Sequence, residues 1–454
     1  MPAADLRSIA ELGPRIATGE VSPVALVEGC LARIEARREL NAFITVLAMS
    51  AFAEARQAAI DIARGHHRGP LHGIPISIKD LIDVAGTPTT AASAVPALHP
   101  EADAPIVRRL REAGAVLIGK TNLHEFAFGT TTEETAFGMV RNPFDASRSA
   151  GGSSSGAAVA LVEGMCFGSI GTDTGGSIRI PSAACGIVGL KPAYAELPCE
   201  GIVPLSTTCD HVGPMTRTVT DARLMFEALA GERVATRSLP GTFTFGVPSG
   251  YLIDRLDREI RNGFTRVREA LEARGHTVRD VVIEDAAITP DVYLHIVLPE
   301  AAQYHARLLE AHAAAYSPGV RLRLEMGRYL LAEDYVRAMQ LRAMLTAQVD
   351  AALDACDALL LPALAIAAPP LGQTTVEIDG TPEPVRGVML RLTQLFNLTG
   401  HPAIAIPSGR TSSGLPVGMQ LVGRHGGTAR LLSIAESVES QIAGGAGSVG
   451  GGTG

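Results

Sequence analysis

The spacing of apolar residues predicts helices and strands in alternation along most of the chain. Apolar residues recur three and four apart, the helical spacing, over 5–18, 22–38, 50–64, 104–114, 257–275, 388–398 and 428–441. Short apolar or alternating segments predict strands at 41–46, 73–80, 115–119, 242–248, 358–371, 402–407 and 418–423. Of these, 358–371 is expected to be a buried strand with its exit loop, since it is too short and too interrupted by proline to cross a membrane. The alternation predicts an α/β fold in which helices cover a sheet.

Two longer regions are expected to border a binding cleft. Residues 195–220 form a loop-rich stretch with three prolines. Residues 290–354 are helical in pattern throughout, with a break at Ser317-Pro-Gly319, and we expect them to form one side of a substrate pocket. The glycine-rich end of the chain predicts disorder. We therefore expect one domain over 1–441 and a disordered tail over 442–454.

Two loops rich in glycine and serine interrupt the regular pattern, at 149–156 and 171–181. Between them, the small apolar residues of 157–164 predict a short buried helix. Glycine lets the backbone approach a ligand closely. Serine supplies a hydroxyl that becomes a nucleophile beside a base, and free backbone amides can bind an oxyanion. The two loops therefore predict a serine nucleophile and its oxyanion hole.

Other interpretations of these loops fit the sequence less well. Flexible linkers can have this composition, but apolar, proline-anchored segments follow the second loop. Gly152-Ser-Ser-Ser-Gly156 matches the nucleophile elbow of α/β-hydrolases, which needs a strand before it, and a polar loop precedes it here. Asp173-Thr-Gly175 matches the aspartic protease loop, but no second copy occurs. The remaining interpretation is a serine whose base lies elsewhere in the chain.

The basic residues suggest where that base lies. Only three of the 39 basic residues are lysines, Lys79, Lys120 and Lys191. A buried lysine can lose its proton and act as a base, whereas arginine stays charged. Lys79 ends the predicted strand 73–80, on the face opposite its isoleucines, and Pro75 predicts an irregular or edge start to that strand. A simple salt bridge between Lys79 and the adjacent Asp80 is the alternative.

Five separated motifs resemble those of the amidase signature family, in the family's order. They are Gly73-Ile-Pro-Ile-Ser-Ile-Lys-Asp80, Gly119-Lys-Thr-Asn122, Gly151-Gly-Ser-Ser154, Gly171-Thr-Asp-Thr-Gly-Gly-Ser-Ile-Arg-Ile-Pro181 and Gly189-Leu-Lys-Pro192. The resemblance extends over nearly the whole chain. It implies a single large domain with a central mixed β-sheet covered on both faces by helices. It also implies hydrolysis of amides without a cofactor.

The resemblance also assigns site residues. It implies a Ser–cis-Ser–Lys triad with Ser177 as nucleophile, Ser153 as the bridging serine after a cis peptide, and Lys79 as base. The amides of Thr174, Gly175, Gly176 and Ser177 would form the oxyanion hole. Ser154, Asp173 and Arg179 would support the site. Ser155 departs from the family, which commonly has glycine there.

The substrate is expected to be a small amide. The loop 121–137 is rich in phenylalanine in a chain with only 4% aromatic residues, so Phe126, Ala127, Phe128 and Gly129 are candidate substrate contacts, although core packing is an alternative for the rings. Few basic residues lie near this loop in the sequence, which favours an apolar or aryl amide. The resemblance leaves carbamates and esters open. It also leaves open a glutaminase-type subunit of a tRNA-dependent amidotransferase.

Composition argues against several other functions. A net charge of −8 without a basic run argues against binding to nucleic acid or an anionic membrane. The six cysteines form no C-x-x-C pair and the twelve histidines show no metal-binding spacing, so neither a metal nor a disulfide framework is expected. A cysteine nucleophile and a Ser–His–Asp site at His211 remain as rivals. The first residues show no targeting pattern, which predicts a cytoplasmic protein, and we expect a monomer or homodimer.

Overall fold

One large mixed sheet organises the chain. The structure is a computed structural model that describes residues 5–231 and 241–444. Within this part of the chain, eleven strands form the sheet, in the order β1 (Phe43–Val46), β3 (Val116–Thr121), β2 (Pro75–Lys79), β4 (Gly168–Asp173), β6 (His211–Thr216), β5 (Val188–Lys191), β12 (Ala403–Arg410), β13 (Pro416–Val422), β9 (Ala358–Pro362), β7 (Thr244–Pro248) and β8 (Thr277–Val281). A separate hairpin consists of β10 (Thr375–Ile378) and β11 (Thr381–Pro384). The sheet is mixed because β2 runs parallel to β3 and β4, whereas β6 runs antiparallel to β4.

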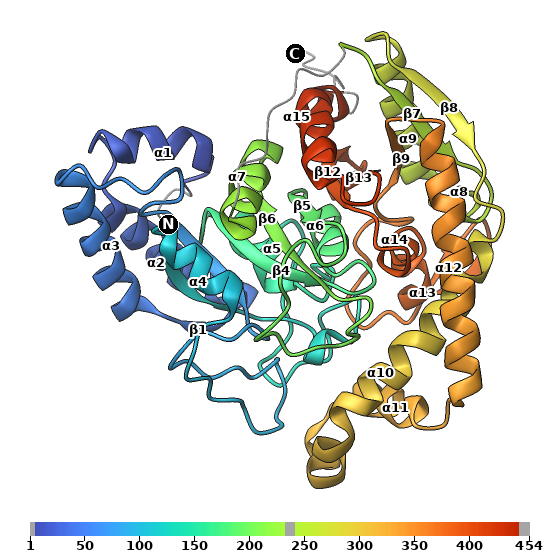
Figure 1. Cartoon of the computed structure of the whole chain (residues 1–454), viewed down its shortest axis with the longest axis horizontal. Helices are drawn as coiled ribbons and strands as arrows, with labels where there is room; N and C mark the ends of the chain where they lie inside the picture. The colour runs from blue at the N-terminus through green and yellow to red at the C-terminus, as the bar shows by residue number, and fades with distance from the viewer. Residues whose placement is uncertain (1–4, 232–240, 445–454) are drawn as a thin grey trace.

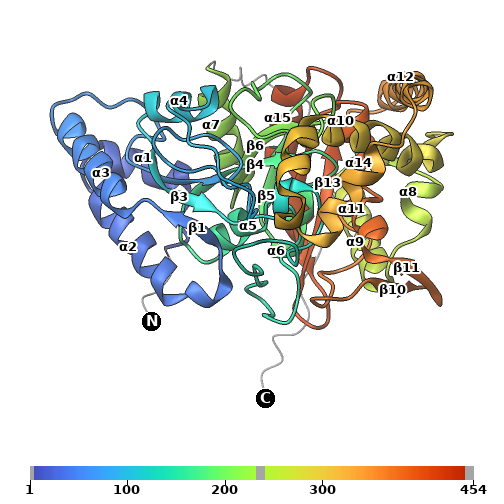
Figure 2. The same cartoon turned by 90° about the horizontal axis from the view of Figure 1, so that it is seen from below.

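Helices flank this sheet along its length (Figure 1). Their bounds are α1 (Ile9–Ala17), α2 (Pro23–Ala36), α3 (Ala48–Ala63), α4 (Pro105–Glu112), α5 (Ser155–Val162), α6 (Arg179–Cys185), α7 (Val219–Ala230), α8 (Tyr251–Asp254), α9 (Arg258–Glu272), α10 (Thr289–His312), α11 (Pro318–Gly327), α12 (Ala332–Asp354), α13 (Val385–Leu390), α14 (Gln394–Leu398) and α15 (Thr428–Gly444). Helices α5 and α6 contact each other and the central strands, and α15 contacts α7, α9 and β12. The N-terminal helices α1 to α3 lie at one end of the molecule and α12 at the other, as both views show (Figure 2).

The central strands and the two small helices are buried on all sides. Every residue of β2, β3, β4, β5 and β6 is buried, and so is every residue of α6. Helix α5 begins at Ser155, in the last residues of the first glycine–serine loop, and is likewise buried throughout, except for its last residue. Its alanines and glycine let it pack closely; a Cβ added at Gly156 would lie 2.2 Å from the carbonyl oxygen of Ala42. The predicted buried helix between the loops is confirmed.

The structure corrects several sequence predictions. Of the two alternatives predicted from Pro75, the irregular start is confirmed, because the register shifts between Ile76 and Ser77. The edge start is wrong, because β2 lies inside the sheet between β3 and β4. The helix predicted over 388–398 is two helices, α13 and α14. The helical region has a second break, between α11 and α12. The closing helix α15 continues to Gly444, and the rest of the predicted tail, 445–454, lies outside the described residues.

No helix within the described residues combines the length and the apolar character that crossing a membrane requires.

Candidate active site

Lys79 and Ser153 meet at the centre of the sheet. Lys79 ends β2, and its Nζ donates hydrogen bonds to Ser153 Oγ at 2.8 Å and to Thr172 Oγ1 at 2.8 Å. Thr172 lies on β4, the neighbour of β2, so strand pairing brings it beside the lysine. Lys79 and Ser153 are completely buried. The peptide bond between Gly152 and Ser153 is cis, as the family resemblance implies.

Ser177 lies in the second glycine–serine loop, between β4 and α6, and the two loops contact each other. The backbone amide of Ser154 donates to the carbonyl of Ser177 at 3.2 Å, and the Ser154 hydroxyl donates to the carbonyl of Thr172 at 3.2 Å. Ser177 keeps 6% of its surface exposed, whereas Ser153 has none. Within the described residues its side chain makes no hydrogen bond to Ser153, so the contact between the loops runs through Ser154.

The backbone before Ser177 has the properties expected of an oxyanion hole. Within the described residues, the amides of Gly175, Gly176 and Ser177 donate no hydrogen bond, so they are free to bind a ligand. The conformation of the loop requires glycine, because Gly176 has φ +142° and a Cβ there would lie 2.3 Å from Thr393 Oγ1. The Thr393 hydroxyl also donates to the carbonyl of Gly175 at 2.5 Å, which fixes the direction of that peptide.

A buried ion pair between Asp173 and Arg179 brackets this loop. The two charged groups lie 3.0 Å apart and are inaccessible to solvent. Asn397 donates to the Asp173 carboxylate at 2.8 Å, and Arg179 also donates to the side-chain oxygen of Gln420 at 3.1 Å. Burial by itself would raise the pKa of Asp173, but the charge and hydrogen bonds of Arg179 outweigh it and hold the pKa well below its usual range. The loop is therefore fixed at both ends by a fully paired network.

Lys79 lies in surroundings that favour its neutral form. Burial lowers the pKa of Lys79 to about 7, against the opposing charges of Asp173 and Asp210. The adjacent Asp80 points away and forms an ion pair with Lys120 at 2.9 Å. The alternative of a salt bridge between Lys79 and Asp80 is therefore wrong. The third lysine, Lys191, donates to the carbonyls of Pro192 and His401.

A cavity of about 640 Å³ opens beside Thr172 and Thr174. Residues 194–205 line much of it, which confirms the expectation that this loop-rich region borders a cleft. Asp210 also lines it and accepts a hydrogen bond from Thr174 Oγ1 at 2.5 Å. Burial raises the pKa of Asp210 to about 6, although the hydrogen bonds from Thr174 and from two backbone amides oppose the shift. Ser177 does not line this cavity; Thr172, the partner of Lys79, does.

The four candidate substrate contacts lie in three different places. Ala127 lines the cavity beside Thr172. Phe126 packs against the rings of His305 and Tyr316. Gly129 lines a separate groove of about 370 Å³. That groove also contains two arginines, Arg323 and Arg386, which lie over the ring of Phe128 at 5.2 and 5.7 Å.

The expectation of few basic residues near this loop is therefore wrong. Arg323 comes from α11 and Arg386 from α13, both far away in the sequence. The other helices of the 290–354 region border the groove of about 390 Å³ lined by Pro299, Tyr304 and Tyr335 rather than the larger cavity.

The two alternatives left open by the sequence, a Ser–His–Asp site at His211 and a cysteine nucleophile, lack the contacts or the ionisation that each would need. His211 Nδ1 bonds the carbonyl of Cys209 at 2.7 Å, and within the described residues neither ring nitrogen contacts a serine. Burial lowers the pKa of His211 well below its usual value, so the ring is neutral. Burial likewise raises the pKa of every cysteine, to about 11 for Cys166 and Cys209 and about 12 for Cys199, which keeps the thiols protonated.

Three residues at the site were not assigned from the sequence. Thr172 lies within the motif at 171–181, and its hydroxyl, one position before Asp173, could have indicated a polar contact at the site. Asp210 precedes His211, but only the pairing of β4 with β6 connects it to Thr174. Asn397 lies in a helix far along the chain, without any local signal.

Comparison with known proteins identifies the family. The family model for amidases matches residues 25–432. The chain belongs to the amidase family. An amidase of Pseudomonas putida is 36% identical over 426 residues, which cover 90% of each chain. A glutamyl-tRNA(Gln) amidotransferase subunit from Nitratidesulfovibrio vulgaris (strain DP4) is 34% identical over 479 positions, which cover 96% of each chain.

A solved amidase structure has the same fold. It is 42% identical and superposes with a TM-score of 0.92, covering 96% of this chain and 100% of that one. The predicted fold, one large α/β domain with a mixed sheet flanked by helices, and the resemblance to amidase signature enzymes are both confirmed. As a member of this family, the protein is a hydrolase of amide carbon–nitrogen bonds.

Proposed function

We propose that this amidase cleaves small uncharged amides through an acyl-enzyme, with Ser177 as nucleophile, Ser153 as proton relay and Lys79 as general base. The observation that carries the proposal is the hydrogen bond of 2.8 Å between Lys79 and Ser153, made by a lysine whose pKa burial lowers to about 7. A lysine that is neutral near physiological pH can accept a proton, and a catalytic base works best with a pKa near the working pH.

Thr172 sets the direction of the base. A neutral amine has two protons and one lone pair, and Lys79 Nζ contacts two hydroxyl groups. Donation to Thr172 directs the lone pair of Lys79 toward Ser153. Ser153 then passes its proton to Lys79 and takes the proton of Ser177 as that hydroxyl attacks the substrate carbonyl.

The amides of the segment from Thr174 to Ser177 stabilise the oxyanion of the tetrahedral intermediate. One such donor contributes about 3 kcal/mol to lowering the barrier. When the intermediate collapses, the carbon–nitrogen bond breaks and the relay returns the proton from Lys79 through Ser153 to the leaving nitrogen. Water then attacks the acyl-enzyme by the same relay, releases the acid and restores Ser177.

The cavity favours an apolar or aryl substrate. Its wall includes Leu197, Ile202 and Val203, which suit an apolar group. Glu196 and Asp210 also line it and disfavour an anionic group there. Anilides of small acids are therefore the first substrates to test, and carbamates and esters share the carbonyl that Ser177 would attack. We expect a monomer or homodimer. Size-exclusion chromatography with light scattering measures the oligomeric state.

The direct test combines labelling with a substrate panel. Wild type should react with a fluorophosphonate at one site, and Ser177→Ala should abolish this reaction without changing the melting temperature; Ser154→Ala is the matched control that should still label. Among anilides, carbamates, primary amides and glutamine, anilides should show the highest kcat/KM. Full labelling of Ser177→Ala would assign the nucleophile to another residue.

A second function, glutamine hydrolysis for a partner complex, has its own support. The Nitratidesulfovibrio vulgaris protein named above covers 96% of the chain. The hydroxyl of Tyr293 lies beside Gly175 of the second glycine–serine loop. Arg386 lies close enough to Tyr293 to interact with it electrostatically. Arg386 is therefore a cation near this loop that suits the carboxylate of an amino acid. Glutaminase activity that exceeds anilide hydrolysis, or that needs added partner proteins, would favour this second function.

A further inference from the structure

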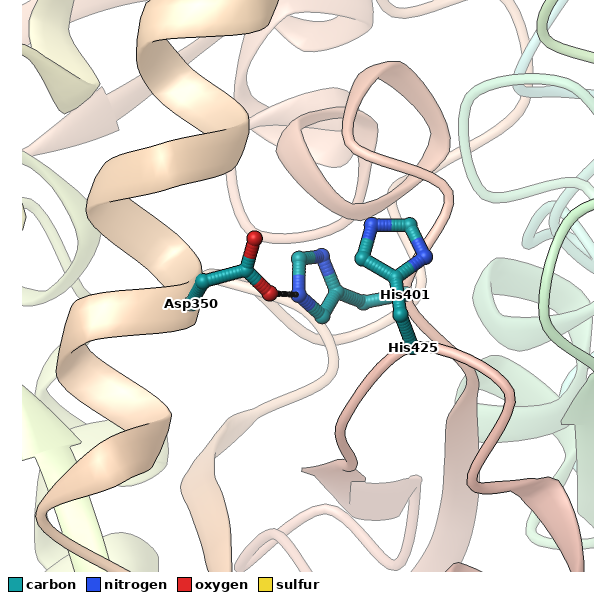
Figure 3. Close-up of side chains that lie close together, drawn as sticks. All are labelled: Asp350, His401 and His425. Atoms are coloured by element: carbon teal, nitrogen blue, oxygen red, sulfur yellow. Dashed lines mark hydrogen bonds and ion pairs between the residues drawn. The ribbon is translucent and has the colours of Figure 1, made fainter.

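Two histidines and one aspartate gather far from the catalytic loops in the sequence, where the C-terminal turn of α12 meets the ends of β12 and β13. Asp350 lies on α12, His401 precedes β12, and His425 lies between β13 and α15. One ligand atom of each lies within 4.8 Å of the others, the one such group of three among the described residues (Figure 3). Figure 3 shows the Asp350 carboxylate and the His425 ring on either side of the His401 ring.

We infer that Asp350, His401 and His425 bind a zinc ion. Two imidazole nitrogens and one carboxylate oxygen form a ligand set that Zn²⁺ accepts, with water in the fourth position. Nothing in the amidase reaction proposed above uses these residues, so the zinc site is separate from that chemistry and does not depend on it.

The surroundings of His401 suit a metal-binding histidine. His401 is fully buried, and its Nδ1 lies 2.9 Å from the hydroxyl of Thr399. A hydroxyl can accept as well as donate, so Thr399 can hold the tautomer of His401 that carries its proton on Nδ1. Nε2 donates its proton to Asp350 Oδ1 at 3.0 Å, because a carboxylate only accepts. Zinc would take the place of this proton, with the ring changing to the tautomer that carries its proton on Nδ1, and would lie between Nε2, Oδ1 and His425.

The third ligand has room to move. Ligand atoms about 2.0–2.1 Å from one zinc ion lie about 3.3 Å apart, so His425 must approach the other two ligands while His401 Nε2 and Asp350 Oδ1 separate slightly from 3.0 Å. His425 is exposed and its ring makes no hydrogen bond within the described residues, so it can make this movement. Gly400 provides the space beside it: Gly400 has φ +71°, and a Cβ there would lie 3.2 Å from His425 Cε1.

The charged groups nearest the site do not block a cation. Arg424, next to His425, is engaged by Asp354 at 2.6 Å and by the carbonyl of Leu353. The Lys191 amine faces the carbonyl of His401 rather than its ring. Asp350 retains 51% of its side-chain surface, so an ion can reach the site from solvent. A bound zinc ion would hold α12 to the loops beside β12 and β13 and would stabilise the folded chain by mass action.

The test uses the metal alone with the full chain. Zn²⁺ should bind wild type with one high-affinity site in calorimetry, with a Kd below about 10 µM, and raise the melting temperature by about 1–3 °C at tenfold excess over that Kd. Co²⁺ should give the visible absorption of a tetrahedral N/O site. His425→Ala and Asp350→Asn, both at exposed positions, should each weaken zinc binding at least tenfold, and the matched control His66→Ala, at another exposed histidine, should not.

Two outcomes would overturn the inference. One is a wild-type Kd above 100 µM for zinc. The other is equal affinity in wild type, His425→Ala and Asp350→Asn. In either case the three residues would form only a hydrogen-bonded contact between α12 and the loop at 399–401. The anilide kcat/KM should remain within twofold in the His425 variant, so loss of zinc binding can be separated from failure of the proposed hydrolysis.

Discussion

Two buried lysines lie on neighbouring strands, Lys79 on β2 and Lys120 on β3, in different electrostatic surroundings. Burial lowers the pKa of both. Lys120 faces the carboxylate of Asp80 at 2.9 Å, which favours its charged form, whereas among the described residues Lys79 contacts two hydroxyl groups and no carboxylate. The comparison indicates why we propose Lys79 rather than Lys120 as the base. Burial without a paired acid favours the neutral amine, whereas a paired acid favours the charged one.

Removing Lys79 should produce the largest loss of activity. General base catalysis contributes about 10²- to 10⁴-fold, so we expect kcat/KM for an anilide to fall about 10³- to 10⁴-fold in Lys79→Met. Lys79→Arg should be almost as inactive, because guanidinium cannot lose its proton. Steady-state kinetics on folded protein measures both. Turnover close to wild type in Lys79→Arg, with an unchanged pH profile, would make the lysine an electrostatic support.

Lys79→Met should lower activity but raise the stability of the folded protein. The folded pKa of Lys79, about 7, is below its unfolded value of about 10.4. Below pH 7 both states bind the proton and the full penalty of burying the charge is present. Between pH 7 and 10 the unfolded state binds the proton and the folded state does not, so rising pH progressively relieves this penalty. By the linkage relation, stability rises with pH where the unfolded state binds more protons, so wild-type stability rises through this window. Lys79→Met should therefore melt higher than wild type, with a difference that shrinks from pH 7 to pH 10.

Removing Lys120 should damage the fold rather than the chemistry. Lys120→Met leaves the Asp80 carboxylate buried without its partner, which costs about 3 kcal/mol of unfolding free energy. Denaturant unfolding measures this loss, and the double variant with Asp80→Asn should recover part of it. Per folded molecule, kcat/KM should stay within about tenfold of wild type. A 10³-fold loss of kcat/KM with normal stability would contradict the distinction between the two lysines.

The pH profile should shift by a smaller amount when Asp210 is neutralised. Wild-type kcat/KM should rise with pH around a midpoint near 7, as Lys79 deprotonates. The negative charge of Asp210 raises the pKa of Lys79, so Asp210→Asn should move this midpoint to lower pH, by less than about one unit. Rates measured from pH 5 to 9 test this, with Glu196→Gln, at the same cavity, as the control. A midpoint displaced to higher pH would show that Asp210 does not act on Lys79.

The smallest effect is expected at Ser155, the departure from the family pattern. Its hydroxyl is buried and has no hydrogen-bond partner among the described residues. Ser155→Gly should therefore change kcat/KM by less than about tenfold, or about 1.4 kcal/mol of barrier. Ser153→Ala, two positions earlier, is the comparison and should be close to inactive. Equal losses in the two variants would mean that the relay is assigned to the wrong serine.

Some features of the fold lacked a pattern that sequence reasoning could detect. Strand β4 has the sequence Gly-Ser-Ile-Gly-Thr-Asp, without apolar alternation, because neighbours pack closely on it; a Cβ at Gly168 would lie 2.3 Å from the sulfur of Met225. Strand β6 contains Pro214, which ordinarily argues against an internal strand. In both strands the surrounding structure decides the conformation and overrides local preference.

The sequence by itself determined the α/β fold class, the buried helix α5, the two glycine–serine loops and Lys79 as a candidate base, because helical and strand periods and glycine-rich loops are properties of a few adjacent residues. The choice of Ser153 and Ser177 within those loops came from the resemblance to the amidase signature family. Only the tertiary structure decided what each charge faces. Pairing of β4 with β6 brings Asp210 to Thr174, and folding of α11 and α13 over Phe128 places two arginines where the sequence showed few. The same packing turns Asp80 toward Lys120, so that Lys79 forms its hydrogen bond with Ser153 and no ion pair with Asp80. The pKa of a buried group depends on desolvation and on charges within a few ångströms, and both are set by contacts between segments that lie far apart in the chain.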